Sequence, residues 1–252
     1  AKSTNHNNIK LLDGTAQNIV IQKGFSADDT MKIGFGSMKT KDIGLGSRAS
    51  LSSVGGTYSA NTNFDAISAG SLLINGVLVG ASLALDDSNS PATAAAASSI
   101  AKAAAINKVA AQSGVYAKAN TNFVSGAAQT AAAVSGTITI NGVTTTTFST
   151  GTDAALNRQA AVNAINAISG QTGVLATDTG DTETGVTLTA ADGRNIVVSF
   201  TTMTSAATGV AAANTYVGSY SLFALDGRDI NVSFRDDTAG NDVQNQTGLR
   251  VG

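Results

Sequence analysis

The chain has 252 residues, a formal net charge of -2 and charged residues at only 13% of its length. Because it has no basic block, neither a nucleic acid nor an anionic membrane surface is expected as a partner, and no apolar run is long enough to span a bilayer. The absence of cysteine and the presence of one histidine, His6, exclude disulfides, thiolate chemistry and most zinc or triad sites.

Residues 1–57 are expected to contain a small β segment and a linker. Apolar residues alternate from Met31 to Phe35 at the period of a strand. We therefore predict two strands within 18–36. The serine- and glycine-rich residues 51–57 are predicted to form a linker.

A hairpin followed by a helix is predicted next. Asn75 and Gly76 stand between two short apolar runs, and both tolerate the positive φ that a type I′ turn requires. Ser90 is predicted to cap an alanine-rich helix over 92–112, which Gly114 ends. The predicted apolar stripe of this helix is Ala103, Ile106 and Val109.

The same order recurs later in the chain. Asn141 and Gly142 form the second predicted turn, and Thr152 or Asp153 caps the second predicted helix, which Gly173 ends. Its apolar stripe is Val162, Ile165 and Ile168. The helices repeat at an offset of 59 (Ile106 to Ile165) and the turns at 66 (Asn75 to Asn141), so the connecting loop is seven residues longer in the first copy.

A third similarity concerns two Asp-Gly-Arg segments at an offset of 34. Asp192 and Gly193 begin one, Asp226 and Gly227 the other, and each pair is predicted to be the turn of a hairpin. The second hairpin-plus-helix copy is followed directly by its Asp-Gly-Arg segment. The counterpart for the first copy appears only after the whole second copy.

This order predicts an α+β fold, mostly β, in which the second of two similar hairpin-plus-helix modules is nested in the first, on a small β base. Insertion at a loop whose ends lie close together carries little loop-closure entropy. Three modules in tandem is the alternative, but it leaves the first module without its closing hairpin. The predicted domains are an inner β base (1–50 with 241–252), a linker (51–57), a middle module (58–134 with 213–240) and an outer inserted module (135–212).

The repeated residues resemble a known family. The Ile-Asn-Gly segments at 74–76 and 140–142, the Ala-Ile-Asn helices and the segment 188–194 are similar to the repeated "IN" motif in the central region of bacterial flagellins. The resemblance covers about 69–234. Residues 11–46 resemble the β region that follows the N-terminal core helix of that family.

The resemblance implies a structural, non-catalytic role on the surface of the flagellar filament, contributing to motility, with no cofactor. It also implies an extracellular location, at the flagellum or cell surface, and other flagellin subunits as partners. In flagellins those contacts run through long terminal helices. Because neither end here shows sustained heptad periodicity, we expect the middle of a flagellin that lacks its polymerising helices.

Other chemistry is expected to be absent or secondary. The zinc-protease pattern His-Glu-x-x-His does not occur, and the paired carboxylates, such as Asp86 with Asp87, stand in turn-like sequence. The alternative function is a flagellin-like cell-surface module that binds polysaccharide or a host glycan. The aromatic residues available for it are Tyr116, Phe123, Tyr216, Tyr220 and Phe223.

Overall fold

The fold is known from a computed structural model that describes most of the chain. It is α+β and mostly β, with short helices and several small antiparallel sheets. The chain divides into two compact units, residues Ala1–Ala49 with Asp226–Arg228 and residues Ser50–Leu225 with Asp229–Gly252. The described residues are 5–6, 9–12, 15–16, 19–23, 30–35, 37, 49–60, 62–225, 229–235 and 243–249.

The first unit contains two short antiparallel pairs of strands. β1 (Asn5–His6) pairs with β2 (Ile9–Lys10). β3 (Ile19–Gln22) pairs with β4 (Thr30–Ile33), which confirms the two strands predicted within 18–36.

The second unit carries the remaining elements. None of its described helices is long and apolar enough to cross a membrane, and the same holds for the described part of the first unit. Its helical segments are η1 (Ala84–Asp86), η2 (Ala95–Ala97), α1 (Ser99–Asn107), α2 (Ala110–Ser113), α3 (Ala154–Ala167), α4 (Ser169–Thr172), α5 (Ser205–Thr208) and α6 (Val243–Thr247). Its strands are β5 (Ser50–Ser52), β6 (Gly56–Thr57), β7 (Leu72–Ile74), β8 (Val77–Leu78), β9 (Val115–Ala119), β10 (Asn122–Val124), β11 (Ser135–Ile140), β12 (Val143–Thr144), β13 (Phe148–Ser149), β14 (Leu175–Asp178), β15 (Val186–Ala190), β16 (Ile196–Thr201), β17 (Asn214–Val217), β18 (Tyr220–Ala224) and β19 (Val232–Phe234).

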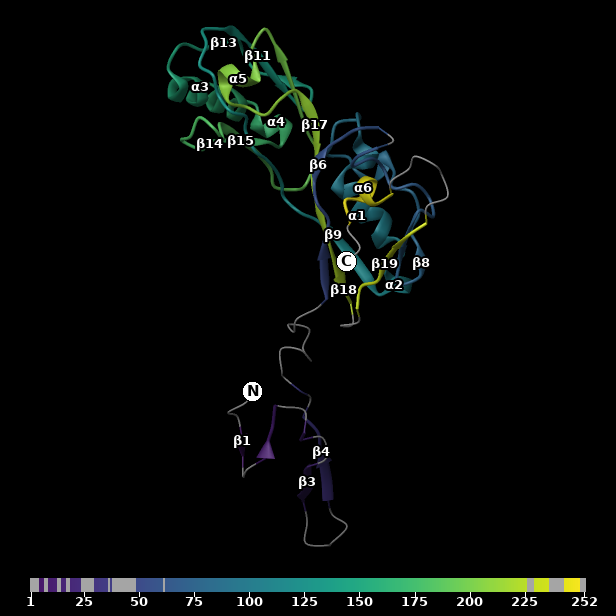
Figure 1. The fold of residues 1–252 in the computed structure, drawn as a ribbon. Helices are drawn as coiled ribbons and strands as arrows, with labels where there is room; N and C mark the ends of the chain where they lie inside the picture. Colours follow the sequence, from purple (N-terminus) through teal and green to yellow (C-terminus); the bar gives the residue numbers. More distant parts are fainter. Residues whose placement is uncertain are drawn as a thin grey trace. The chain divides into compact units, whose positions relative to one another are not determined.

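Two sets of these elements follow the same order. Each has an incoming strand, an Asn-Gly hairpin, a helix pair, two strands that pair with each other, a strand that pairs with the hairpin, and a short helix. The first set is β5, β7, β8, α1, α2, β9, β18, β19 and α6, and the second set is β10, β11, β12, α3, α4, β14, β15, β16 and α5. Along the chain, the second set lies between β9 and β18 of the first set (Figure 1).

Strand pairing in the two sets matches residue by residue. β19 pairs with β7 of the first hairpin, just as β16 pairs with β11 of the second. The strand that closes the first hairpin therefore comes from beyond the whole second set. The equivalent cross-strand pairs are Ala117 with Leu222 and Ala176 with Leu188, then Ile74 with Val232 and Ile140 with Val198.

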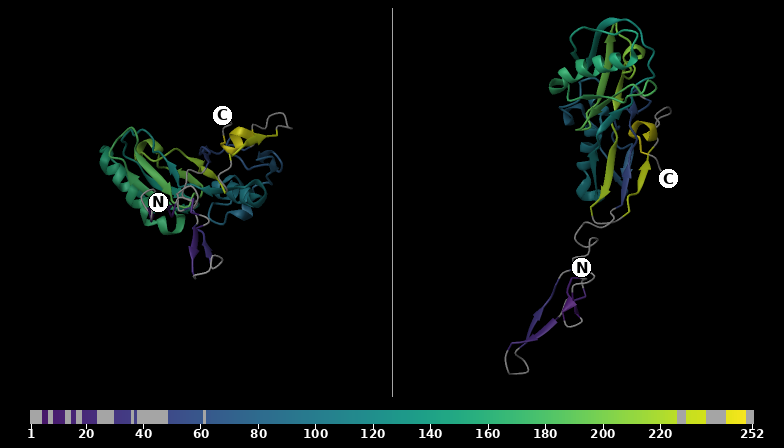
Figure 2. Two further views of the ribbon diagram at one scale, coloured as in Figure 1. Left: turned by 90° about the horizontal axis from the view of Figure 1, so that it is seen from below. Right: turned by 90° about the vertical axis from the view of Figure 1, so that its left-hand side faces the viewer.

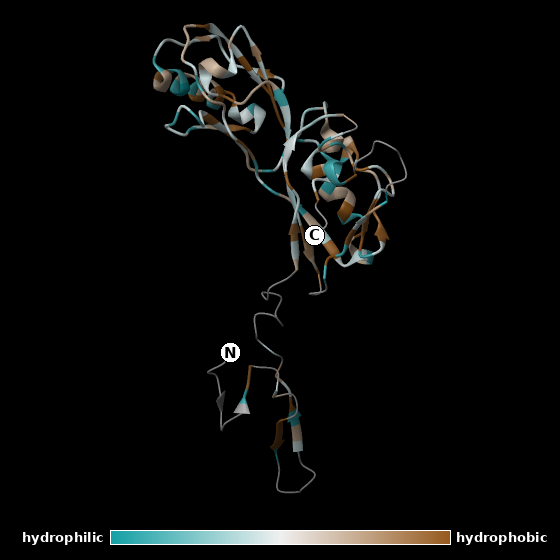
Figure 3. Cartoon of the chain, in the orientation of Figure 1, coloured by the Kyte–Doolittle hydropathy of each residue, from teal (hydrophilic) through white to brown (hydrophobic). Residues whose placement is uncertain are grey.

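Each set has its own hydrophobic core of small and branched side chains. Ile106 of α1 and Ile165 of α3 are fully buried at equivalent positions. α3 contacts β13, β14 and β15 and lies across the strands of the second set (Figure 2). Figure 3 shows both hydrophilic and hydrophobic residues on α3, as expected for a helix that buries one face. The first core includes Ile67, Leu72, Ile74, Ile106, Tyr220 and Leu222, and the second includes Ile138, Ile140, Ile165, Leu188 and Ile196.

The predicted helix over 92–112 is shorter and broken. Ala94 adopts a φ of 61°, and α1 begins only at Ser99. Its cap is Ser98, whose Oγ accepts from the Ala101 N–H at 3.0 Å, and not Ser90 as predicted. The preceding residues are held by contacts with the second set, so helix propensity does not decide their conformation.

Two other segments differ from their predicted roles. Residues 51–57 contain parts of β5 and β6, which pair with β18 and β17. The glycines there permit close approach, since a Cβ on Gly55 would lie 2.6 Å from the Val217 carbonyl oxygen. Residues 243–249 pack on the first set, because Val243 and Leu249 are apolar and buried, and Leu249 belongs to its core.

Candidate functional site

The two Asn-Gly pairs form the two-residue turns of their hairpins. Asn75 and Asn141 each have a φ of 50°, and Gly76 and Gly142 have φ values of 79° and 83°. These are the positive angles that a type I′ turn requires. Asparagine suits this position partly because it adopts the left-handed backbone conformation more readily than most residues.

The side chain of Asn141 has a second role that the turn alone did not predict. Its backbone N–H donates to the Val197 carbonyl, and the Val197 N–H donates back to Asn141 Oδ1 at 2.8 Å. Asn141 Nδ2 donates to the Thr172 carbonyl at 3.1 Å, at the end of α4. Asn141 thus links the hairpin to the neighbouring strand and also binds a carbonyl at the end of α4 that has no partner within the helix.

The first set repeats this arrangement. The Asn75 N–H donates to the Asn231 carbonyl, and Asn231 N–H donates to Asn75 Oδ1 at 2.8 Å. Asn75 Nδ2 donates to the Ser113 carbonyl at 2.9 Å. The bonds to Ser113 and Thr172 are equivalent, so the "IN" asparagines have a structural role in both copies.

The helix asparagines are equivalent as well. Asn107 holds β9 through both polar atoms of its amide, accepting from the Ala117 N–H at 2.7 Å and donating to the Ala117 carbonyl at 2.9 Å. Asn166 makes the same two bonds with Ala176 of β14. The recurrence of Ala-Ile-Asn at one offset was the sequence signal for this role.

The hairpin predicted at Asp192-Gly193 is wrong, although the residues do form a turn. β15 pairs with β14 and β10, whereas β16 pairs with β11 and β17, so the turn carries the chain from one sheet to another. The Gly193 N–H donates to the Ala190 carbonyl at 3.2 Å, and Gly193 has a φ of 85°. Asp226 and Gly227, the matching prediction, lie outside the described residues.

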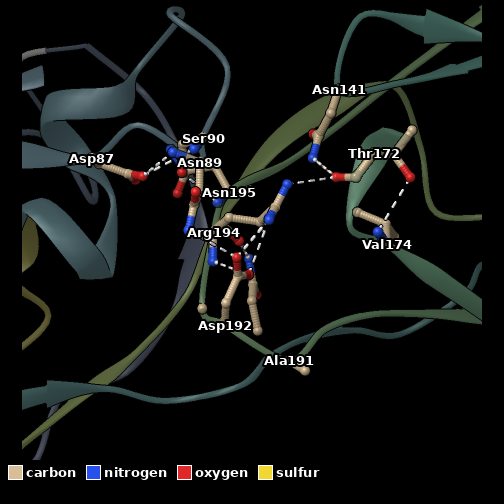
Figure 4. A network of polar contacts seen from close by, with 12 residues as sticks. Asp87, Asn89, Ser90, Asn141, Thr172, Val174, Ala191, Asp192, Arg194 and Asn195 are labelled. Atoms are coloured by element: carbon tan, nitrogen blue, oxygen red, sulfur yellow. Dashed lines mark hydrogen bonds and ion pairs between the residues drawn. The ribbon is translucent and has the colours of Figure 1, made fainter. Parts of the chain in front are cut away.

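Arg194 organises this turn (Figure 4). Its guanidinium donates to Asp192 from Nη2 at 2.6 Å and from Nε at 2.9 Å, and its Nη1 donates to the Thr172 carbonyl at 3.1 Å. Thr172 O therefore accepts from both Arg194 and Asn141. Burial raises the pKa of Asp192, but the hydrogen bonds and charge of Arg194 outweigh it and the net pKa is lowered.

The second set meets the first at this turn. The receiving loop, residues 79–98, is the connection that is longer in the first copy. Asn89 Nδ2 donates to Asp192 Oδ2 at 3.2 Å, and the Asn195 N–H donates to Ser90 Oγ at 2.9 Å. Asn195 is fully buried and its Nδ2 donates to the Ala94 carbonyl. The longer loop therefore supplies the contact surface for the second set.

Two buried oxygens in this junction, Asp87 Oδ2 and Asn195 Oδ1, have no hydrogen-bond donor within the part of the chain that the structure describes. The other oxygen of Asp87 accepts from the N–H groups of Asn89 and Ser90. The charge of Asp87 also contributes to raising the pKa of Arg194, after the larger effect of the Asp192 hydrogen bonds. The junction is a fixed arrangement of opposite charges, suited to holding two sets together.

Two further carboxylates form ion pairs. Asp86 pairs with Lys108 at 2.6 Å, and Asp178 pairs with Arg158 at 2.6 Å. The described residues contain no group of three or more His, Cys, Asp or Glu side chains able to hold a metal ion. The carboxylates Asp236, Asp237 and Asp242 and the second arginine, Arg228, lie outside the described residues.

The short helices α5 and α6 are each held near their C-terminal end by a side chain from elsewhere. Lys102 is fully buried, and its Nζ donates to the Gln246 carbonyl of α6 at 2.7 Å. Gln129 Nε2 donates to the Ala207 carbonyl of α5 at 3.1 Å. Burial lowers the pKa of the Lys102 amine to about 7, against the smaller opposing effect of Asp65.

The five aromatic residues considered for glycan binding do not form one surface. Tyr220 is buried, and its hydroxyl donates to the Thr247 carbonyl. Tyr116 and Phe223 stack on each other with centroids 5.1 Å apart. Phe123 and Tyr216 line a cavity of about 400 Å³. Its other lining residues are Gly55, Gly56, Thr57, Thr121, Asn122, Val124, Ser125, Val217 and Ser219.

A comparison with protein-family models and a comparison with curated proteins both find no match to this chain.

Proposed function

We propose that the chain forms the non-catalytic surface domains of a flagellin-type filament subunit, contributing to motility. In this proposal the second set is a copy of the first that is nested between β9 and β18. Residues of the first unit form a small β base. The partners are other subunits of the filament, and the location is extracellular, at the flagellum or cell surface.

The observation that carries the proposal is the pairing of β9 with β18. The chain leaves the first set along β9 and returns along β18, its antiparallel neighbour. An out-and-back path of this kind is what a domain projecting from a filament requires. The polar contacts around Arg194 also support a structural role. They hold the two sets together, and their arrangement does not match a catalytic site.

The test joins this chain to the terminal helical segments of a filament-forming flagellin, in cells that lack their own flagellin. We expect filaments that carry the chain on their outer surface. Because the chain has no cysteine, a Leu156→Cys variant gives a single labelling site at a side chain that is 62% exposed. Maleimide dye should label intact filaments along their length.

The matched control is Ile165→Cys, at a fully buried position of the same helix. It should remain unlabelled until the filaments are unfolded. Failure to form filaments, or failure of Leu156→Cys to react on intact filaments, would contradict the proposed role.

A further inference from the structure

The cavity lined by Phe123 and Tyr216 lies between β10 of the second set and the paired strands β6 and β17. Its walls come from the whole of β10 and its flanking residues, from β6 and from the end of β17. Its volume of about 400 Å³ lies within the range of roughly 300–1,000 Å³ typical of small-molecule sites. Nothing in the proposed structural role uses this cavity.

An exposed aromatic ring borders the cavity. Phe123 stands on β10 with 61% of its surface exposed, opposite Thr189 of β15. Tyr216 is half-buried, and its hydroxyl donates to the Ala212 carbonyl at 2.9 Å, which fixes the ring. A large apolar ring held at a cavity edge offers a flat face to a ligand at a low entropy cost.

The rest of the lining is uncharged and mixes polar with apolar residues. Thr57, Thr121, Ser125 and Ser219 supply hydroxyl groups, and among the described residues no lysine, arginine, aspartate or glutamate borders the cavity. An anionic ligand would be desolvated there without a compensating charge. Thr121 Oγ1 already donates to the Ala191 carbonyl and Ser219 Oγ accepts from Asn120 Nδ2. A purely apolar ligand would displace water from the exposed Thr57 and Ser125 hydroxyl groups without replacing its hydrogen bonds.

The chemistry that satisfies both features is a neutral sugar. A pyranose ring has an apolar C–H face that stacks on an aromatic ring, and an edge of hydroxyl groups that exchange hydrogen bonds with serine, threonine and backbone groups. We propose that this cavity binds a neutral pyranose saccharide, with Phe123 as the stacking residue and Tyr216 as the fixed wall. The uncharged lining favours neutral over acidic polysaccharides.

The test uses the whole chain, labelled with ¹⁵N, titrated with cellobiose, maltose and N,N′-diacetylchitobiose in the millimolar range. We expect saturable chemical-shift changes at residues 121–125 and 216–219 with at least one of these sugars. A disaccharide that carries a glucuronic acid should bind more weakly. No saturable change with any of the three neutral sugars, or tighter binding of the acidic one, would overturn the proposal.

The decisive variant is Phe123→Ala, which should weaken binding at least tenfold. The matched control is Leu156→Ala, because Leu156 is equally exposed (62%) but does not line the cavity; its affinity should be unchanged. Phe123→Tyr keeps the ring and should retain binding even if the alanine variant folds poorly. Equal affinity of folded Phe123→Ala would place the ligand elsewhere, and loss of binding in folded Phe123→Tyr would contradict the stacking role of this ring.

Discussion

Ala119 lies directly opposite Tyr220 in the antiparallel pair of β9 and β18, although the whole second set lies between them in the chain. Opposed residues in such a pair have Cα atoms about 4.5–5.5 Å apart. That separation is the span of a two-residue turn. The two ends of segment 120–219, which contains the second set, are therefore as close together as the ends of a hairpin loop.

The first prediction follows from this closeness. A variant in which Asn-Gly replaces residues 120–219, joining Ala119 to Tyr220, should fold with the first core intact. Circular dichroism and a cooperative thermal transition would measure this. The receiving loop loses Asp192 and Asn195 as partners, so its amides should exchange faster than in the full chain.

A register control sharpens that experiment. Joining Ala119 to Leu222 with the same turn offsets the pairing by two residues and should fold less stably. If the first variant is unfolded, or if both variants are equally stable, nesting of the second set is wrong.

The second prediction concerns Asn141. Asn141→Ala removes bonds to Val197 N and Thr172 O and places alanine at a φ of 50°. The expected loss in the free energy of unfolding is about 2–4 kcal/mol. Asn141→Gly removes the same bonds without the backbone strain, so it should be less destabilising by about 1 kcal/mol. Chemical denaturation measures both, and equal stability of the two variants would exclude the strain.

The third prediction tests the Arg194 contacts. Arg194→Met should lower the free energy of unfolding by about 1–2 kcal/mol, because a partly exposed ion pair and a bond to Thr172 O are lost. Arg194→Lys should be more stable than Arg194→Met but less stable than the unmodified chain, because lysine lacks the planar guanidinium group that binds a carboxylate with two parallel hydrogen bonds. Hydrogen exchange should rise at Asn89 and Ser90, and unchanged exchange there would show that Arg194 does not hold the receiving loop.

Arg194 also predicts an acid dependence. Because the pKa of Asp192 is lowered in the folded chain, its contribution to stability is complete above its unfolded value of about 3.9 and is lost as the pH falls through the folded value. As the pH falls from about 5 to the folded pKa of Asp192, the free energy of unfolding should therefore decrease less in Arg194→Met than in the unmodified chain.

The fourth prediction separates backbone strain from close packing. A Cβ on Gly185 would clash with the Gly209 carbonyl oxygen and lie 2.6 Å from that of Ala127, whereas Gly180 has open space around it. Both glycines have positive φ, 57° and 76°. Gly180→Ala should cost about 1–2 kcal/mol, and Gly185→Ala about 3 kcal/mol or more. Thermal unfolding that ranks the two variants equally would exclude the close-packing effect.

The fifth prediction concerns the buried amine of Lys102. Its pKa is about 7 in the folded chain and near 10.5 when unfolded, so between these values the unfolded chain binds more protons. Stability should rise with pH from about 7 to 9.5, with a slope of at most about 1.4 kcal/mol per pH unit. Lys102→Met should abolish this slope, while Lys118→Met, at an exposed position of β9, should keep it. A slope that persists in Lys102→Met would assign it to another group.

Local sequence signals predicted the two Asn-Gly turns, the cap of α3 and the glycines that end α2 and α4, because the deciding contacts are close in sequence. Gly114 and Gly173 have φ values near 70° at the ends of α2 and α4, as their positions predicted. Asp153 caps α3 through the N–H groups of Ala155 and Leu156. In each case the responsible atoms lie within a few residues.

The junction could not be predicted in this way because its partners are far apart in sequence. Ser90 matches the local pattern of a helix cap, yet its hydroxyl accepts from the N–H of Asn195. The Asp-Gly pair at 192–193 matches a hairpin turn, but strand pairing assigns its flanks to different sheets. Both predictions are wrong because long-range contacts override the local conformational preference. The extra length of the receiving loop was visible in sequence, but its purpose was not.

The adjacency of β9 and β18 also has a mechanical consequence. A drag force on the second set pulls both strands in the same direction, so the hydrogen bonds between them carry little of the load. The load falls instead on their outer neighbours, on the pairing of β18 with β5 and on the contact of α1 with β9. Under flow, the first set should yield there before β9 and β18 separate from each other.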